Sequence, residues 1–271
     1  MMRTALALCV ALAGPAGGRE IGAEALDSLP QVDVVVLGEV HDNPAHHANQ
    51  ARAVRAMQPA ALVFEMLQPA QVAALPDDLS DAAAVAAATE WEARGWPDFA
   101  MYHPIFLAAP EARIYAGDVP RSVVRMAIRD GAAAAFGQDA GLFGLTAPLA
   151  AEVQAEEEKA MLAAHCWAMP AEALPGMVEA QRLRDAVLAQ AALTALRETG
   201  GPVAVITGVG HARTDIGVPA LIRLASPTVT VLSVGQMEAV PEGRPPHDLW
   251  IVTDGVKDRG DPCEGFGSVE G

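Results

Sequence analysis

The chain has 271 residues, a length that fits a single α/β domain, and 52% of them are hydrophobic, which excludes a disordered chain. Its 18 Lys and Arg residues against 34 Asp and Glu residues give a formal net charge of −16. Such an acidic surface repels phosphate backbones and anionic lipids, so no nucleic-acid partner is expected.

The N-terminus has one early Arg, an apolar run over residues 5–13 and then several small residues. This order is typical of a short secretory signal peptide, and the apolar run is too short to span a bilayer. We therefore expect a signal peptide over residues 1–17 and a periplasmic or secreted protein. A lipid anchor would need a Cys directly after the apolar run, whereas Cys9 lies inside it, so no lipid anchor is expected.

Removal of this signal would leave two cysteines, Cys166 and Cys263. In an oxidising compartment they could form a disulfide, but the sequence does not show that they lie close together. One small buried residue and one free thiol in the tail is an equally good interpretation.

After the N-terminus, short runs rich in Val and Ile alternate with helical patterns. We expect buried strands at residues 32–39, 60–67, 113–119, 201–211 and 228–236, and an edge strand at 247–254. Helices are expected at residues 44–58, 76–95, 96–110 with a break near Pro104, 120–131, 147–169, 172–200 and 217–225, and a surface loop at 132–147. This alternation predicts an α/β fold over residues 30–255, with a mostly parallel central sheet, flanking helices and a helical insertion. Residues 256–271 are expected to form a loose tail.

Four of the expected strands end in an acidic residue or a histidine. The side chains concerned are Glu39 with His41, Glu65, Asp118 and His211. Ligands bind at the carboxyl ends of parallel strands, so these side chains are candidates for one site. The alternative is that polar residues simply begin where strands end.

The sharper signal is a repeated Gly-x-x-His motif, which occurs at residues 38–41 and again at residues 208–211. Glycine at the end of a strand permits a tight turn or a close backbone approach, and the histidine can then fold back over the sheet edge. Two such turns predict a site that combines His41 and His211 with Glu39 and Glu65. These four residues could bind a divalent metal ion or carry out acid–base catalysis.

His46 and His47 fall in the first turns of the next helix. Successive helix positions face different ways, so we expect at most one of them to point into the site, and a solvent-exposed position is an equally good interpretation for the other. Asp42 and Asn43 are interpreted as helix caps, and Asn43 is the better one because it precedes Pro44 directly. The chain has neither a Gly-rich phosphate loop nor a Gly-x-Ser-x-Gly elbow.

The segments VVLGEVHDNPAHHANQ, LVFEML, WPDFAMYHPIFLAA, RIYAGDVPRS and ITGVGHARTDIGVPALI together resemble the ChaN-like family of haem-binding uptake lipoproteins. That family shares a superfamily with the erythromycin esterases, TraB and the Tiki proteases. The resemblance extends from about Val32 to Leu232. It implies an α/β core and an envelope protein that binds haem as its cofactor in iron uptake. It also implies a homodimer with stacked haems and an envelope haem-uptake receptor as partner.

The resemblance also implies a tyrosine ligand for haem. Tyr102 lies in the matching segment, with His103 beside it as a second ligand or only a neighbour. The alternative for Tyr102 is packing on Trp96 or Phe99. Tyr115 lies inside an expected strand and is assigned to the core.

Hydrolytic members of the superfamily use the paired Gly-x-x-His and Glu residues as their active site, some of them with a metal. A second hypothesis is therefore a hydrolase, in which His41 or His211 acts as general base while Glu39 and Glu65 orient them or hold a metal. In this hypothesis an arginine, Arg113 or Arg121, steadies an anion.

Overall fold

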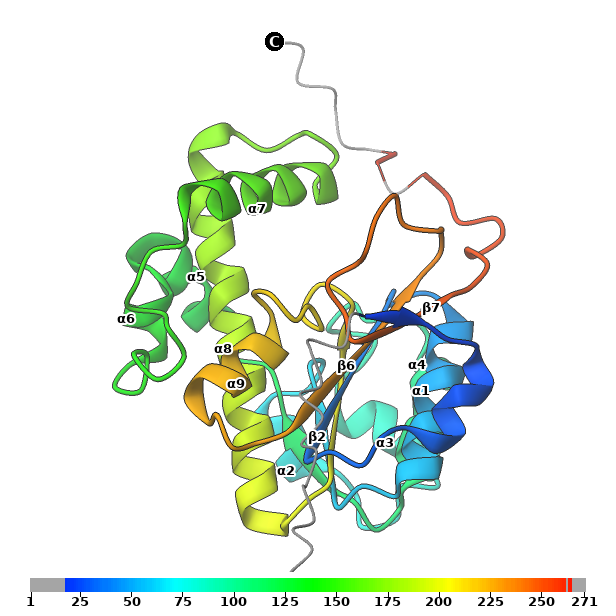
Figure 1. Ribbon diagram of the computed structural model, residues 1–271. Helices are drawn as coiled ribbons and strands as arrows, with labels where there is room; N and C mark the ends of the chain where they lie inside the picture. The colour runs from blue at the N-terminus through cyan, green and yellow to red at the C-terminus, as the bar shows by residue number, and fades with distance from the viewer. Residues whose placement is uncertain (1–17, 262, 265–271) are drawn as a thin grey trace, which may run out of the picture.

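The computed structural model describes residues 18–261, 263 and 264, so the expected signal peptide and Cys9 lie outside the described residues. A sheet of seven parallel strands crosses the molecule in the order β1-β7-β6-β2-β5-β3-β4 (Figure 1). The strands are β1 (Arg19–Glu20), β2 (Val34–Glu39), β3 (Ala61–Phe64), β4 (Arg113–Ala116), β5 (Val203–Gly208), β6 (Val231–Met237) and β7 (Leu249–Val252). The predicted α/β fold is confirmed.

Helices cover both faces of this sheet (Figure 1). They are η1 (Ala23–Ser28), α1 (Pro44–Met57), α2 (Pro69–Ala74), α3 (Ala82–Ala88), α4 (Phe99–Ala108), α5 (Arg121–Asp130), α6 (Ala132–Phe136), α7 (Ala151–Ala164), η2 (Ala171–Ala173), α8 (Leu174–Thr199) and α9 (Val218–Ala225). Side chains alternate across each strand, so Val35 and Leu37 join the core under α1 and α4, whereas Val34 and Val36 join the core under α8 and α9. Both faces of β2 are buried, which explains its unbroken apolar run.

The helical insertion lies between β4 and β5, and the two long helices expected there are α7 and α8. The expectation of a surface loop over residues 132–147 is wrong. It contains α6, and its side chains Phe143 and Leu145 are buried in the core under α8. The many small residues around them concealed this short packed segment.

Three other expectations about elements need correction. The helix expected over residues 76–95 is limited to α3, which Asp81 caps by accepting from the backbone of Ala83 and Ala84. Helix α4 continues through Pro104 without a break. The expected edge strand β7 is covered by the short strand β1, whose Arg19 pairs with Leu249.

The described part of the C-terminal tail is anchored, although residues 256–271 were expected to be loose. Cys263 forms a disulfide with Cys166, which follows α7. The Arg259 guanidinium binds the carboxylates of Asp42 and Glu238 with contacts of 2.6 Å. Within the described ranges of the chain, no helix combines the length and the apolar character needed to cross a membrane.

Replacing both Cys166 and Cys263 with Ser should lower the free energy of unfolding by about 2–4 kcal/mol, because the disulfide closes a long loop and restricts the unfolded chain. The two cysteines are 97 residues apart in the sequence. Urea unfolding followed by circular dichroism measures the change. The wild-type protein with reducing agent should match the variant, and an unchanged midpoint in both would contradict the prediction.

Candidate functional site

The two Gly-x-x-His motifs meet at the carboxyl edge of the sheet. Strands β2 and β5 are neighbours, Glu39 is in register with Gly208, and the Val209 amide donates to the Glu39 carbonyl oxygen at 2.7 Å. A Cβ atom at Gly38 would lie 2.9 Å from Cβ of Ala212. A Cβ atom at Gly208 would lie 3.1 Å from Nε2 of His41. A side chain at Gly38 would therefore force Ala212 or the Val209 backbone to move, and one at Gly208 would press on the His41 ring, so the two motifs form one structural unit.

Around this unit, six ionisable side chains alternate between imidazole and carboxylate, each in contact with the next. This alternating row consists of His47, Glu39, His41, Glu65, His211 and Asp185. Strand β3, which lies beside β5, places Glu65 at the centre, and α8 brings Asp185 to one end. The four catalytic residues predicted from the sequence thus lie together.

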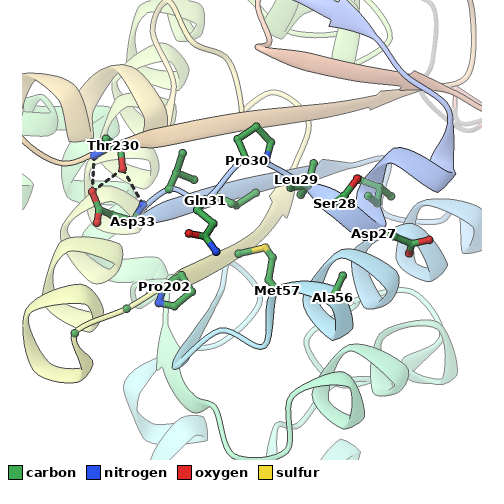
Figure 2. A pocket seen from close by; sticks show the side chains of 15 residues that line it. Asp27, Ser28, Leu29, Pro30, Gln31, Asp33, Ala56, Met57, Pro202 and Thr230 are labelled. Atoms are coloured by element: carbon green, nitrogen blue, oxygen red, sulfur yellow. Dashed lines mark hydrogen bonds between the residues drawn. The ribbon is translucent and has the colours of Figure 1, made fainter.

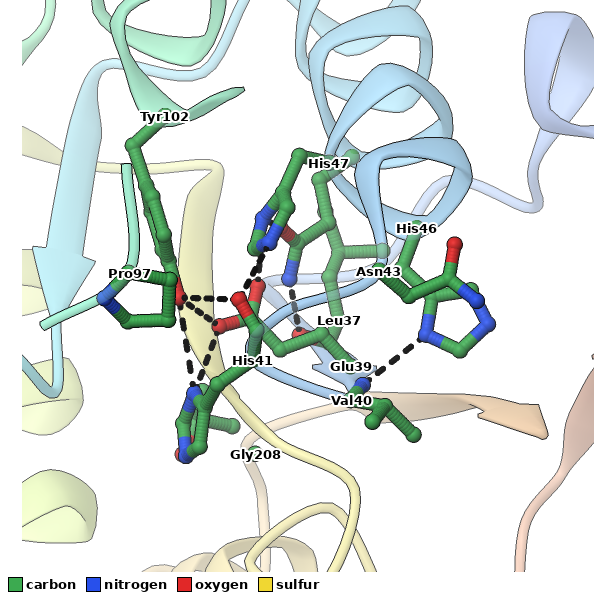
Figure 3. Close-up of polar contacts among 12 residues, drawn as sticks. Leu37, Glu39, Val40, His41, Asn43, His46, His47, Pro97, Tyr102 and Gly208 are labelled. Carbon is green, nitrogen blue, oxygen red and sulfur yellow. Dashed lines mark hydrogen bonds and ion pairs between the residues drawn. The ribbon is translucent and has the colours of Figure 1, made fainter. Parts of the chain in front are cut away.

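Glu39 is the centre of the first half of the row, and it is buried (Figure 3). One carboxylate oxygen, Oε1, lies 2.9 Å from Nδ1 of His41 and accepts a 2.7 Å hydrogen bond from the Tyr102 hydroxyl. The other oxygen lies 3.0 Å from Nδ1 of His47. Burial raises the pKa of Glu39, but the hydrogen bonds from His41 and His47 outweigh burial and lower it. Glu39 is therefore ionised.

His47 is an imidazolium on hydrogen-bonding grounds alone. Its Nε2 lies 2.9 Å from the His41 carbonyl oxygen, and its Nδ1 contacts the Gln50 amide oxygen at 3.2 Å. The Gln50 nitrogen donates to the Leu37 carbonyl, which fixes the amide orientation. Since every partner of His47 is an acceptor, both ring nitrogens must donate. Burial lowers its pKa, but the hydrogen bond to Glu39 and that negative charge raise it overall.

Glu65 is the centre of the second half. Its Oε2 accepts from the Thr207 hydroxyl at 2.7 Å and from the Gly208 amide at 2.6 Å. Its Oε1 faces two imidazoles, with Nε2 of His41 at 3.8 Å and Nε2 of His211 at 3.5 Å. Burial raises the pKa of Glu65, but the positive charges on His211 and His41 lower it well below its usual range. Two imidazoles thus converge on one ionised carboxylate.

His211 ends the row together with Asp185, whose Oδ1 lies 2.7 Å from Nδ1 of the ring. Burial lowers the pKa of His211, but the negative charges of Glu65 and Asp185 raise it overall. The pKa of His41 is also raised overall, because the hydrogen bond to Glu39 and the negative charge of Glu65 outweigh the effect of burial. The pKa of each imidazole is thus raised, and each ring is oriented by a buried carboxylate on its Nδ1 side.

His46 has a different role, and a solvent-exposed position for one of the two neighbouring histidines is excluded, because both are buried. Nδ1 of His46 accepts from the Val40 amide, and Nε2 contacts the Thr253 hydroxyl, which fixes the loop after β2. Burial lowers its pKa to about 4, so this ring is neutral. Asn43 caps α1 by accepting from the Ala45 amide, as predicted. Asp42 pairs with Arg259 instead of capping.

Tyr102 lies on α4, with its side chain fully buried against Trp91 and His47 rather than against Trp96 or Phe99. Burial and the negative charge of Glu39 raise its pKa far above the usual value. To bind iron, the hydroxyl would have to leave Glu39 and become exposed. Its role as a haem ligand stays a prediction.

The histidine beside Tyr102 belongs to another neighbourhood. His103 is half-buried and directs Nε2 to the Leu79 carbonyl oxygen at 2.8 Å, so it takes no part in the alternating row. Tyr115, which was assigned to the core, is only half-buried and donates to Glu198.

A pocket of about 540 Å³ opens beside the row. Its floor includes Glu65 and His211, and its walls carry Trp96, Asp118, Val119, Pro120, Val124 and the three arginines Arg94, Arg121 and Arg184. The predicted location of Arg121 beside the site is thus consistent with this pocket. Arg113 begins β4 at the opposite edge of the sheet, where it pairs with Glu198 at 2.9 Å, so it cannot steady an anion here.

A hollow of similar size, about 550 Å³, lies at the amino ends of the strands (Figure 2). Its two acidic residues are already engaged, because Asp27 binds Arg52 and Asp33 accepts from Thr230. No ionisable pair is directed into this hollow, so the carboxyl edge is the better candidate for chemistry.

No group of three or more His, Cys, Asp or Glu side chains with the arrangement of a metal site occurs within residues 18–261, 263 and 264. The divalent metal ion predicted at Glu39, His41, Glu65 and His211 is therefore not supported. These side chains contact one another directly, as ion pairs.

Asp185 is the one member of the row that the sequence did not point to. Asp185 lies among apolar residues on the buried face of α8, between Leu183 and Ala186. A carboxylate within an apolar stripe is a signal that can be read from sequence, because a buried charge needs a partner. His47 was named, but its charge depends on acceptors that only the folded backbone brings together.

Comparison with known proteins identifies relatives of this chain. The family model described as "Haem-binding uptake, Tiki superfamily, ChaN" matches residues 25–222. A structure of ChaN from Campylobacter jejuni, described as showing cofacial haem binding, is 18% identical, with a TM-score of 0.59 over 83% of this chain and 88% of that one.

The type III effector HopBA1 is 15% identical, with a TM-score of 0.45 over 86% of this chain and 92% of the other. No match was found among the curated proteins. The family match spans well over half of the sequence, and the chain therefore belongs to the ChaN family of haem-binding uptake proteins in the Tiki superfamily.

Proposed function

We propose that the protein binds haem outside the cytoplasm and acts in haem or iron uptake. The observation that carries this proposal is the family match over residues 25–222. The ChaN structure of Campylobacter jejuni, described by its cofacial haem binding, shares the fold. The proposal includes a homodimer and an envelope haem-uptake receptor as partners, because the family match implies a role in haem uptake.

The pocket beside the alternating row fits a haem in its chemistry. Its volume of about 540 Å³ lies within the range of cofactor sites. Trp96, Val119 and Val124 give it apolar walls, and the arginines give it positive charge. When bound, haem would supply an iron centre that takes an axial ligand from the protein.

His41 is the side chain of the row best placed to ligate iron. Its side chain is 37% exposed, against 8% for His211, and Tyr102 is fully buried. Glu39 holds Nδ1, which leaves Nε2 as the donor, an arrangement common among metal-ligating histidines. His41 does not itself line the pocket, but its ring packs edge-on against Trp96 and its Nε2 lies 3.8 Å from Glu65, and both of these residues line it.

The disulfide supports a location outside the cytoplasm, because structural disulfides persist in oxidising compartments. The signal-like sequence of residues 1–17 supports the same location.

Titration of the purified protein with hemin should produce a shifted Soret band. His41→Ala should abolish the shift or weaken binding by about a hundredfold, because the axial ligand is lost. Tyr102→Phe should leave the shift largely intact, because the buried hydroxyl does not face the pocket. Absorbance spectroscopy measures both. His165→Ala, in the helical insertion, is the matched control.

The same titration should depend on pH, since a proton competes with iron for Nε2 of His41. The pKa of His41 is raised above its ordinary value of 6.5, so binding should weaken as the pH falls, starting above pH 6.5. If the wild-type protein gave no Soret shift, the proposal of haem binding would be contradicted. Loss of the shift in Tyr102→Phe alone would restore tyrosine as the ligand.

A second candidate function, hydrolysis, is favoured by one observation: the imidazoles of His41 and His211 converge on the ionised Glu65. In this alternative His41 acts as general base toward a water molecule, Glu65 orients the two imidazoles, and His211, held by Asp185, acts as general acid. The group given a proton by His211 would be the leaving oxygen of an ester.

With p-nitrophenyl acetate as the probe, a hydrolase should lose about 10²–10⁴-fold in rate on Glu65→Gln, the usual contribution of positioned acid and base groups, because both imidazoles lose the carboxylate that orients them. Glu198→Gln, at the opposite edge of the sheet, should keep the wild-type rate. The rate should also fall as rising pH removes the proton from His211. Equal rates for wild type and Glu65→Gln would exclude this alternative.

A further inference from the structure

Three arginines gather in one pocket of a chain whose formal net charge is −16. Arg94 comes from the segment before α4, Arg121 from the first turn of α5 and Arg184 from α8. They are far apart in sequence, so only the fold brings their charges together. Two carboxylates, Asp118 and Glu65, line the same pocket. The pocket wall therefore has an excess of positive charge.

Asp118 already occupies two of these arginines. The Arg94 guanidinium lies 2.6 Å from Oδ2 of Asp118, and that of Arg184 lies 3.2 Å from Oδ1. Gln68 also donates to Oδ2 at 2.8 Å. The carboxylate thus fixes the arginine side chains at the wall, and one negative charge cannot neutralise two guanidinium groups and Arg121.

Arg121 has no ion-pair partner among residues 18–261, 263 and 264. It is exposed and occupies the first position of α5, a ten-residue helix whose N-cap, Pro120, makes no side-chain capping bond. The free amide groups and the dipole at this helix end add to the positive potential. The guanidinium of Arg121 is hydrated in the absence of a ligand. It can form charge-assisted hydrogen bonds when a carboxylate binds beside it.

We infer that Arg121 and Arg184 form an anion subsite that binds a carboxylate of the molecule occupying the pocket. The inference rests on the proposed function, since haem carries two propionate carboxylates. Arg94 and Asp118 act as positioning residues, because they hold the Arg184 guanidinium at the wall. Trp96 and Val124 line the same pocket and would provide apolar contacts to the rest of the molecule.

The test compares hemin with hemin dimethyl ester, in which both carboxylates are neutral. The double variant Arg121→Gln/Arg184→Gln should raise the hemin Kd at least about tenfold, equivalent to about 1.4 kcal/mol. The ester should bind the wild type more weakly than hemin does, and the double variant should bind the ester no more weakly than the wild type does. Soret titration gives all four Kd values.

Arg125→Gln is the matched control, because Arg125 is exposed on the same helix one turn later and does not line the pocket. Arg121→Gln alone serves as a second variant that breaks no ion pair within the described part of the chain. Its hemin Kd should also rise. Equal hemin Kd values for wild type, Arg121→Gln and the double variant would overturn the inference.

If the wild-type protein does not bind hemin, the proposed function is contradicted. The anion subsite is then tested separately with a second probe. Inorganic phosphate, titrated against protein labelled with ¹⁵N-arginine, should then shift an arginine Nε–Hε resonance that is absent in Arg121→Gln. No such shift would overturn the subsite as well. Binding of phosphate without hemin would assign the subsite to a free anion rather than to a propionate.

Discussion

The burial of three carboxylates with three imidazoles is the constraint on which the carboxyl edge of the sheet depends. An ionised group without a partner is costly in the interior, and removing one member of a buried pair typically costs about 3–5 kcal/mol. Here Glu39, Glu65 and Asp185 are each held by at least one histidine. The row as a whole is neutral when every member is ionised, which permits so many titratable groups to share a small volume.

The backbone is shaped to meet this constraint. Gly38 and Gly208 have no side chains at the points where the two motifs touch, so β2 and β5 can end beside each other with His41 folded over the gap. The Gly208 amide then donates to Glu65. The same glycines that allow the turn therefore also supply part of the polar environment, which explains why motif and site coincide.

Much of this organisation could be predicted from the sequence. The apolar runs of β2 and β5, and the polar residues that follow them, indicated both the sheet and the edge where Glu39, His41, Glu65 and His211 meet. The rest depended on long-range packing. The burial of Tyr102 could not be predicted from a helical pattern, because it results from the contact of α4 with α1. The charge of His47 could not be predicted, because it depends on the carbonyl oxygen of His41. The pocket could not be predicted, because its arginines come from three separate segments.

The alternating row also joins two parts of the molecule that the sequence separates. Five of its members come from the sheet edge and the start of α1, whereas Asp185 comes from α8 in the helical insertion. The 2.7 Å contact between Asp185 and His211 is thus a mechanical link as well as an electrostatic one. If α8 tilted away, His211 would lose one of its two negative neighbours and release its proton more readily. The proton on His211 therefore depends on a residue that lies in the helical insertion as well as on the residues at the sheet edge.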